Sequence, residues 1–94
     1  MIYHKNINML VSYYLMYSYA YYKENESIIT DHEYDQICQD LITNWDNITH
    51  WHKPLLNLES LKAGTGYDIK YPKRVQFAAI ALIKENQLKT TEMD

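Results

Sequence analysis

The sequence predicts a small all-α protein, a bundle of three main helices. The first half of the chain is free of helix breakers, because both prolines and both glycines fall after residue 50. Apolar residues recur there at three- and four-residue steps, which is helical spacing. A length of 94 residues, 47% of them hydrophobic and 22% charged, is typical of one folded domain. We expect one domain over residues 1–94, with helices over about 4–23, 31–46 and 72–89.

The first predicted helix, about residues 4–23, carries two neighbouring apolar stripes. Two stripes make a wide apolar arc, so we expect this helix to be covered on more than one side. Most of its tyrosines are therefore expected in the core or at its rim, with only their hydroxyls needing partners. The first stripe is Ile7, Leu10, Val11, Tyr14, Tyr17, Ser18 and Tyr21, and the second is Met9, Tyr13, Met16 and Ala20.

The second predicted helix, about residues 31–46, begins with a recognisable signal. Thr30 followed by Glu33 is a capping box, in which each residue satisfies a free backbone N–H of the other. Cys38 falls on the apolar face, so we expect a small buried side chain there rather than a nucleophile. A single cysteine excludes an internal disulfide and fits a reducing compartment. The apolar face comprises Tyr34, Ile37, Cys38, Leu41, Ile42 and Trp45.

An irregular segment, from about 46 or 47 to 71, separates the second and third predicted helices. Its stretch "PLLNLESL" is compatible with a short helix over 54–61, and residues 67–71 with a short extended piece. Pro72 suits the first position of the helix predicted over about 72–89. The tail after that helix is expected to fray.

Charge and hydropathy argue against two classes of partner, nucleic acid and membrane. The formal net charge is −3, with 9 Lys and Arg against 12 Asp and Glu, so DNA binding is not expected. A late basic cluster, Lys62, Lys70, Lys73 and Arg74, is better explained as a solvated surface. Residues 6–22 carry no charge, but six of these residues are tyrosines, which is too polar for a secretion signal or a membrane span. We expect a cytoplasmic protein.

Asp46, His50 and His52 form a D-x3-H-x-H pattern. Such ligands suit Zn²⁺ or another divalent ion. A helix end followed by a loop with histidines beside Trp51 is the commoner arrangement, and we expect no metal here.

Residues 21–35, "YYKENESIITDHEYD", hold the candidate site. Acids in the first turns of a helix interact favourably with the helix dipole, which by itself accounts for Asp31, Glu33 and Asp35. Asp31 and Asp35, however, are four residues apart, and like charges at that spacing cost roughly 0.2–0.5 kcal/mol. This cost raises the alternative that the two carboxylates face a ligand.

An antiparallel helix pair would bring two groups of side chains together. Tyr21 and Tyr22, at the end of the first helix, would approach Asp31, Tyr34 and Asp35 at the start of the second. Aromatic faces and carboxylate acceptors would then line one cleft. Such a cleft suits a flat, electron-poor ring that bears hydroxyl groups, because the ring stacks on tyrosine and hydroxyls donate to carboxylates.

The stretch "YYKENESIITDHEYDQICQDL" resembles the N-terminal nicotinamide-recognition domain of NAD-dependent DNA ligases. That family reads, approximately, Tyr-Tyr/His, a short polar loop with an Ile, then Ser/Pro/Thr-Asp-x-Glu-Tyr-Asp-x-Leu. The resemblance covers about residues 10–45. It implies that Tyr21 and Tyr34 pack on the nicotinamide ring and that Asp31 and Asp35 contact its amide or the ribose hydroxyls. Tyr22 stands where many members have His, and Glu33 is expected to reach back to the Thr30 amide.

Two departures from the family limit the activity that the resemblance implies. The acidic Asp-Ser-Pro-Thr segment expected after the second helix is replaced by "HWHKPLLNLES", and no Lys-x-Asp-Gly motif occurs. Without that lysine no adenylated enzyme forms, so we do not expect an enzyme.

Two functions of different classes follow from the sequence. The first is a non-catalytic, ligase-related module that binds nicotinamide mononucleotide (NMN) or the nicotinamide half of NAD, in the service of a ligase-core protein or as a sensor. The alternative is a phage-encoded interaction or inhibitor protein, acting in the host cytoplasm, that binds a host ligase or defence factor. Its motivation is the tyrosine-rich arc of the first helix, because tyrosine is a favoured interface residue. A homodimer is compatible with either function.

Overall fold

The computed structural model describes residues 6–66 and 69–92, and for residues 89–92 the backbone alone. The order of elements is α1 (Ile7–Lys23), α2 (Asp31–Thr43), the short 3₁₀ turns η1 (Trp45–Asn47) and η2 (Lys53–Leu55), α3 (Leu58–Ala63) and α4 (Lys73–Glu92). No strand occurs among these residues, which confirms the all-α prediction. No helix in the described ranges is long and apolar enough to cross a membrane.

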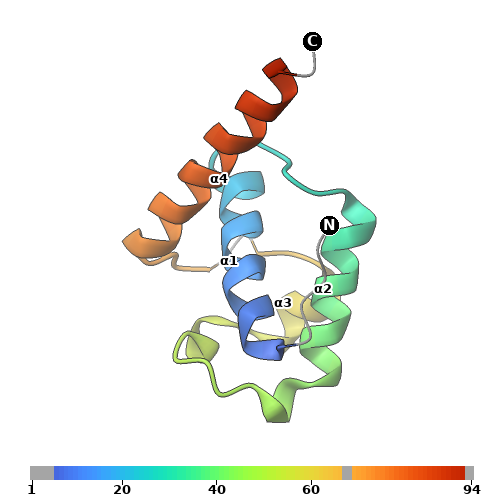
Figure 1. The fold of residues 1–94 in the computed structure, drawn as a ribbon. Helices are drawn as coiled ribbons and strands as arrows, with labels where there is room; N and C mark the ends of the chain where they lie inside the picture. The colour runs from blue at the N-terminus through green and yellow to red at the C-terminus, as the bar shows by residue number, and fades with distance from the viewer. Residues whose placement is uncertain (1–5, 67–68, 93–94) are drawn as a thin grey trace.

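Helix α1 lies at the centre of the bundle, antiparallel to α2 and crossed by α4 (Figure 1). Its start is capped by Asn6, whose side chain accepts a hydrogen bond from the Asn8 N–H at 2.9 Å. Its end is followed by Asn25 in the left-handed conformation at φ 56°, which Asn tolerates better than most residues. As the two stripes predicted, the helix is covered on more than one side, and its buried residues are Leu10, Val11, Tyr14, Leu15, Ser18 and Ala20.

Helix α2 begins as the sequence predicted and ends earlier. Thr30 and Glu33 form the expected capping box, with the Glu33 N–H donating to Thr30 Oγ1 and the Thr30 N–H donating to Glu33 Oε1, both at 3.1 Å. The α-helix stops at Thr43 and continues as η1, so the predicted helix to residue 46 is an α-helix followed by a 3₁₀ turn. Cys38 is 1% exposed, as expected of a small core residue.

The segment between α2 and α4 contains more structure than a plain loop. The short helix expected over 54–61 is displaced: η2 occupies Lys53–Leu55, and α3 begins at Leu58 after the Asn57 side chain caps it. Part of the segment is tied to the start of α1, because Asn8 Oδ1 accepts from the Thr49 and His50 N–H groups at 2.9 and 3.1 Å. Of the extended piece suggested over 67–71, residues 67–68 lie outside the described ranges, and 69–71 are not a strand.

Helix α4 packs on α1 and then runs beyond it (Figure 1). It begins at Lys73, one residue later than predicted, with the Pro72 carbonyl accepting from the Gln76 N–H at 3.0 Å. Its buried residues Val75, Ala79 and Ile83 follow at four-residue steps. The helix also reaches Glu92 instead of ending near residue 89, so the backbone over 90–92 is helical rather than frayed.

The loop after α3 lies directly against α1. The Tyr14 hydroxyl donates to the Thr65 carbonyl at 2.9 Å, and the Tyr71 hydroxyl donates to the Gly66 carbonyl at 2.5 Å. A Cβ added at Gly66 would lie 2.7 Å from the Ser18 Cβ and 2.8 Å from its Oγ, closer than real Cβ atoms approach. The loop can therefore reach α1 only with a glycine at position 66.

We expect Gly66→Ala to lower the free energy of unfolding by about 1–3 kcal/mol, because the methyl group overpacks a buried contact. Urea denaturation measures the change, and a double-mutant cycle with Ser18→Gly supplies the control. Removal of the Ser18 side chain takes away the two closest atoms and leaves the Tyr71 hydroxyl oxygen at 3.1 Å, so Gly66→Ala should be less destabilising in that background. An equal loss in both backgrounds would show that the clash with Ser18 is not the cause.

Candidate functional site

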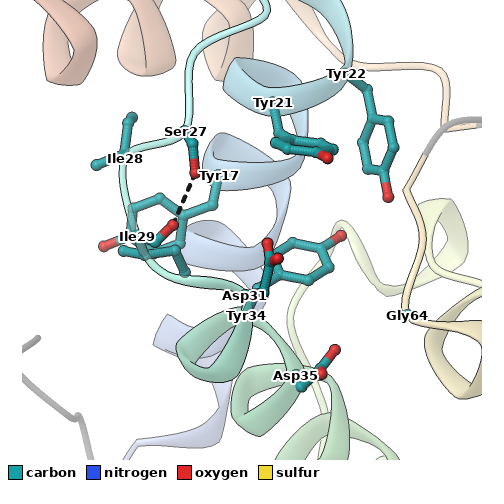
Figure 2. A pocket seen from close by; sticks show the side chains of 10 residues that line it. All are labelled: Tyr17, Tyr21, Tyr22, Ser27, Ile28, Ile29, Asp31, Tyr34, Asp35 and Gly64. Atoms are coloured by element: carbon teal, nitrogen blue, oxygen red, sulfur yellow. Dashed lines mark hydrogen bonds between the residues drawn. The ribbon is translucent and has the colours of Figure 1, made fainter.

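A cavity of about 280 Å³ lies where the end of α1 meets the start of α2. All five site residues predicted from the sequence contribute to its lining: Tyr21 and Tyr22 from α1, and Asp31, Tyr34 and Asp35 from α2. Figure 2 shows the two tyrosines of α1 on one side and the three α2 residues facing them across the gap. The antiparallel pairing thus brings the predicted side chains together.

The aromatic side of the cavity is formed by two tyrosines at right angles. The Tyr21 and Tyr22 rings have centroids 4.8 Å apart and planes 86° apart, an edge-to-face contact. Tyr21 is 50% exposed, so one of its surfaces is available to a ligand. Tyr22 is half-buried. The pair therefore offers a partly exposed ring held in a defined orientation by its neighbour.

Tyr34 joins the cavity to the core. Its hydroxyl is 2.6 Å from the hydroxyl of Ser18, which is fully buried, and its ring lies 5.8 Å from the Tyr14 ring between centroids. Burial, reinforced by the nearby Tyr14 hydroxyl, raises the pKa of Tyr34 above its ordinary value. Tyr34 is therefore a neutral, firmly positioned wall of the cavity.

The acidic side of the cavity is formed by Asp31 and Asp35. Both residues are exposed, on successive turns of α2. Glu33, between them, is occupied by the capping box, and the hydrogen bond from the Thr30 backbone N–H lowers the pKa of its carboxyl group. The capping box thus anchors α2 and leaves Asp31 and Asp35 directed to the cavity (Figure 2).

Gly64 closes the cavity from the side of α3. It ends that helix in the left-handed conformation, at φ 70°, where a side chain is strained. A Cβ at this position would lie 3.4 Å from Asp35 Oδ1. A side chain at position 64 would therefore contact the Asp35 carboxylate, and glycine leaves that space open.

Five lining residues were not among the sequence-based candidates. Tyr17 lies one helical turn before Tyr21, so the three- and four-residue spacing of α1 was a signal that could have found it. Ser27, Ile28 and Ile29 lie in the loop that joins α1 to α2. Because the predicted cleft lies between these two helix ends, their position in that loop could have identified them. Gly64 comes from α3, and no local signal linked it to the site. The five are Tyr17, Ser27, Ile28, Ile29 and Gly64.

The suggested metal pattern is arranged differently from a metal centre. His50 Nδ1 accepts a hydrogen bond from the His52 N–H at 3.0 Å, so its proton is on Nε2, which is 3.2 Å from Ser12 Oγ. Both ring nitrogens of His50 are thus occupied. Within the described ranges no group of three or more His, Cys, Asp or Glu side chains is placed to hold a metal ion.

No protein-family model, curated protein or solved structure matches this chain. By its fold and site, this is a small all-α protein with an aromatic and acidic cavity between two helix ends. The resemblance of residues 10–45 to the ligase recognition domain stays a prediction from the sequence.

The buried hydroxyl and thiol groups beneath the cavity predict alkaline sensitivity. Burial, with a smaller effect of the Asp35 charge, raises the pKa of Cys38 from 9.0 to about 12, and burial raises the pKa values of Tyr14 and Tyr34 above 10.0. The unfolded chain loses these protons first. The stability they confer is therefore complete below about pH 9 and is lost as pH rises from about 9 for Cys38 and from about 10 for the tyrosines.

Urea denaturation between about pH 8 and pH 11 measures this loss. The control is Tyr34→Phe, which removes one ionisable group and its hydrogen bond. It should be less stable than the parent protein at about pH 8 but show a shallower decline above about pH 10. A parent protein whose free energy of unfolding stays constant over that range would contradict the burial of these groups.

Proposed function

We propose that this protein is a non-catalytic module that binds NMN or the nicotinamide half of NAD in the cavity between α1 and α2. The observation that carries the proposal is that Tyr21, Tyr22, Asp31, Tyr34 and Asp35 line one cavity. The volume of about 280 Å³ lies just below the range of small-molecule pockets, which span roughly 300–1,000 Å³. It favours one nucleoside-sized group over a whole dinucleotide.

The charge of the cavity favours the oxidised nicotinamide ring. Its ten lining residues include two carboxylates and no Lys, Arg or His. The oxidised ring carries a positive charge, which is attracted by the carboxylates and by the face of a tyrosine. The partly exposed Tyr21 ring is the surface on which we place it.

The same arrangement indicates where the ribose and the phosphate of NMN lie. Ribose hydroxyls donate hydrogen bonds to Asp31 and Asp35, and charge-assisted bonds of this kind contribute about 1.5–3 kcal/mol. Because no cationic side chain lines the cavity, the phosphate of NMN is placed at the mouth, in contact with water. Recognition then rests on the ring and the ribose.

The chain has no equivalent of the lysine to which a ligase attaches AMP, so the proposed role is binding without chemistry. Such a module works through a partner that carries the missing ligase core, or as a cytoplasmic sensor of the nucleotide. The alternative of a phage inhibitor rested on the tyrosine-rich arc of α1. Packing takes up most of that arc: Tyr14 is buried, Tyr13, Tyr17, Tyr19 and Tyr22 are half-buried, and Tyr21 faces the cavity.

Isothermal titration calorimetry with NMN and with NAD tests the proposal. Asp35→Asn removes one carboxylate, and Tyr21→Ala removes the exposed ring; each should weaken NMN binding by about 10- to 100-fold, the equivalent of about 1.4–2.8 kcal/mol. Both side chains are exposed or half-exposed, so thermal stability should hardly change. Asp46→Asn, in the exposed 3₁₀ turn η1, is the matched charge control. Absence of heat with both ligands would eliminate the proposal.

The redox state of the ligand provides a second test. Reduced NMN has a neutral dihydronicotinamide ring, so it loses the attraction of the two carboxylates while it keeps its ribose and phosphate. We expect it to bind about tenfold more weakly than NMN in the same calorimetric titration. Equal affinities would show that the cavity does not select the charged ring.

A further inference from the structure

A second cavity, of about 270 Å³, lies on a different part of the molecule. It is bordered by α1, by the loop at residues 50–52 and by the first turns of α4. Met16, Val75 and Ala78 supply apolar walls, while His50, Trp51, His52 and Arg74 supply aromatic and polar groups. In contrast with the first cavity, its lining includes a cation and no carboxylate.

Trp51 and Arg74 form the exposed part of this second cavity. The Trp51 side chain is 67% exposed, although its indole is among the largest apolar surfaces in the chain. The Arg74 guanidinium lies 5.8 Å from the centroid of the Trp51 ring, and the His52 ring packs at 3.7 Å between centroids. An indole in contact with an imidazole and a guanidinium offers both a stacking surface and a positive charge.

His52 forms a buried part of the lining of the second cavity. The side chain is 6% exposed, and its Nε2 is buried without a hydrogen-bond partner among the described residues. A buried polar atom without a partner costs about 1–3 kcal/mol. Burial, with smaller effects of His50 and Arg74, lowers the pKa of His52, so its ring is neutral at pH 7.

We propose that the second cavity binds a small planar ring that carries an anionic group, an aromatic carboxylate in the first instance. The ring stacks on Trp51, and its carboxylate pairs with the Arg74 guanidinium. Guanidinium is suited to this role because its planar fork matches a carboxylate with two hydrogen bonds. This site is separate from the proposed nicotinamide cavity and does not depend on it.

The chain contains an internal control for the proposal. It has two tryptophans, and Trp45 also carries a cation over its ring, with Lys53 Nζ 4.8 Å from the centroid. Trp45 does not line the second cavity. An anion attracted to any tryptophan beside a cation would therefore affect both indoles, whereas a ligand of the second cavity would affect Trp51.

The experiment is a titration of the ¹⁵N-labelled protein with benzoate, followed by the two indole N–H signals in NMR spectra. The expected result is a saturable shift of the Trp51 signal, with little change at Trp45 and a much smaller shift with neutral benzamide. Arg74→Gln should weaken benzoate binding at least about fivefold, while Lys73→Gln, the same charge change at the neighbouring exposed residue, should leave it within about twofold.

Three results would overturn the proposal: no shift of Trp51 with benzoate, equal shifts of both tryptophans, or equal weakening by Arg74→Gln and Lys73→Gln. The last two would indicate non-specific attraction of anions to the basic surface. Both substituted side chains are exposed, so the variants should keep the fold, and their spectra report this directly.

Discussion

The buried side chain of Ser18 is the contact on which the arrangement depends. Its hydroxyl is 2.6 Å from the Tyr34 hydroxyl of α2, and the same side chain leaves no room for a Cβ at position 66. One small polar residue in the middle of α1 therefore sets the distance to a second helix and to the loop after α3. A larger side chain at position 18 would push both away, because interiors are packed too closely to absorb it.

The candidate cavity follows from this contact. Tyr34 is held by Ser18, so the first turns of α2 are fixed against α1, and Asp31 and Asp35 reach the space below Tyr21. Gly66 brings the chain close to α1, and Gly64, two residues earlier, borders Asp35. The rigid core ends where the cavity begins: Tyr14 is fully buried, while Tyr21, two turns later on α1, is half-exposed. A preformed wall of this kind reduces the ordering that a ligand would otherwise have to impose.

The two cavities differ in the charge of the residues that line them. A net charge of −3 describes a weakly acidic protein, but the lining of one cavity carries two carboxylates and that of the other carries an arginine. Each combines its charge with an exposed aromatic ring, Tyr21 in the first and Trp51 in the second. Local charge beside a ring decides which ligand is attracted at short range, and the total charge does not report it. The two cavities are therefore expected to attract ligand groups of opposite charge.

The sequence by itself determined the elements whose signals are local. Helical spacing predicted α1, the capping box placed the start of α2 at Asp31, and the seven-residue connection between α1 and α2 made an antiparallel pair the natural arrangement. That pairing was enough to bring Tyr21, Tyr22, Asp31, Tyr34 and Asp35 to one cavity, although whether they bind a nucleotide stays a prediction. The sequence did not predict the extra turn of α4 or the displacement of the short helix to Leu58. Helix ends depend on packing and on caps such as Asn57. Tertiary structure alone decided the contact between Ser18 and Gly66, the place of Gly64 at the cavity and the meeting of Trp51 with Arg74. These contacts join residues that are far apart in the chain, and the periodicity of one helix contains no information on what packs against it.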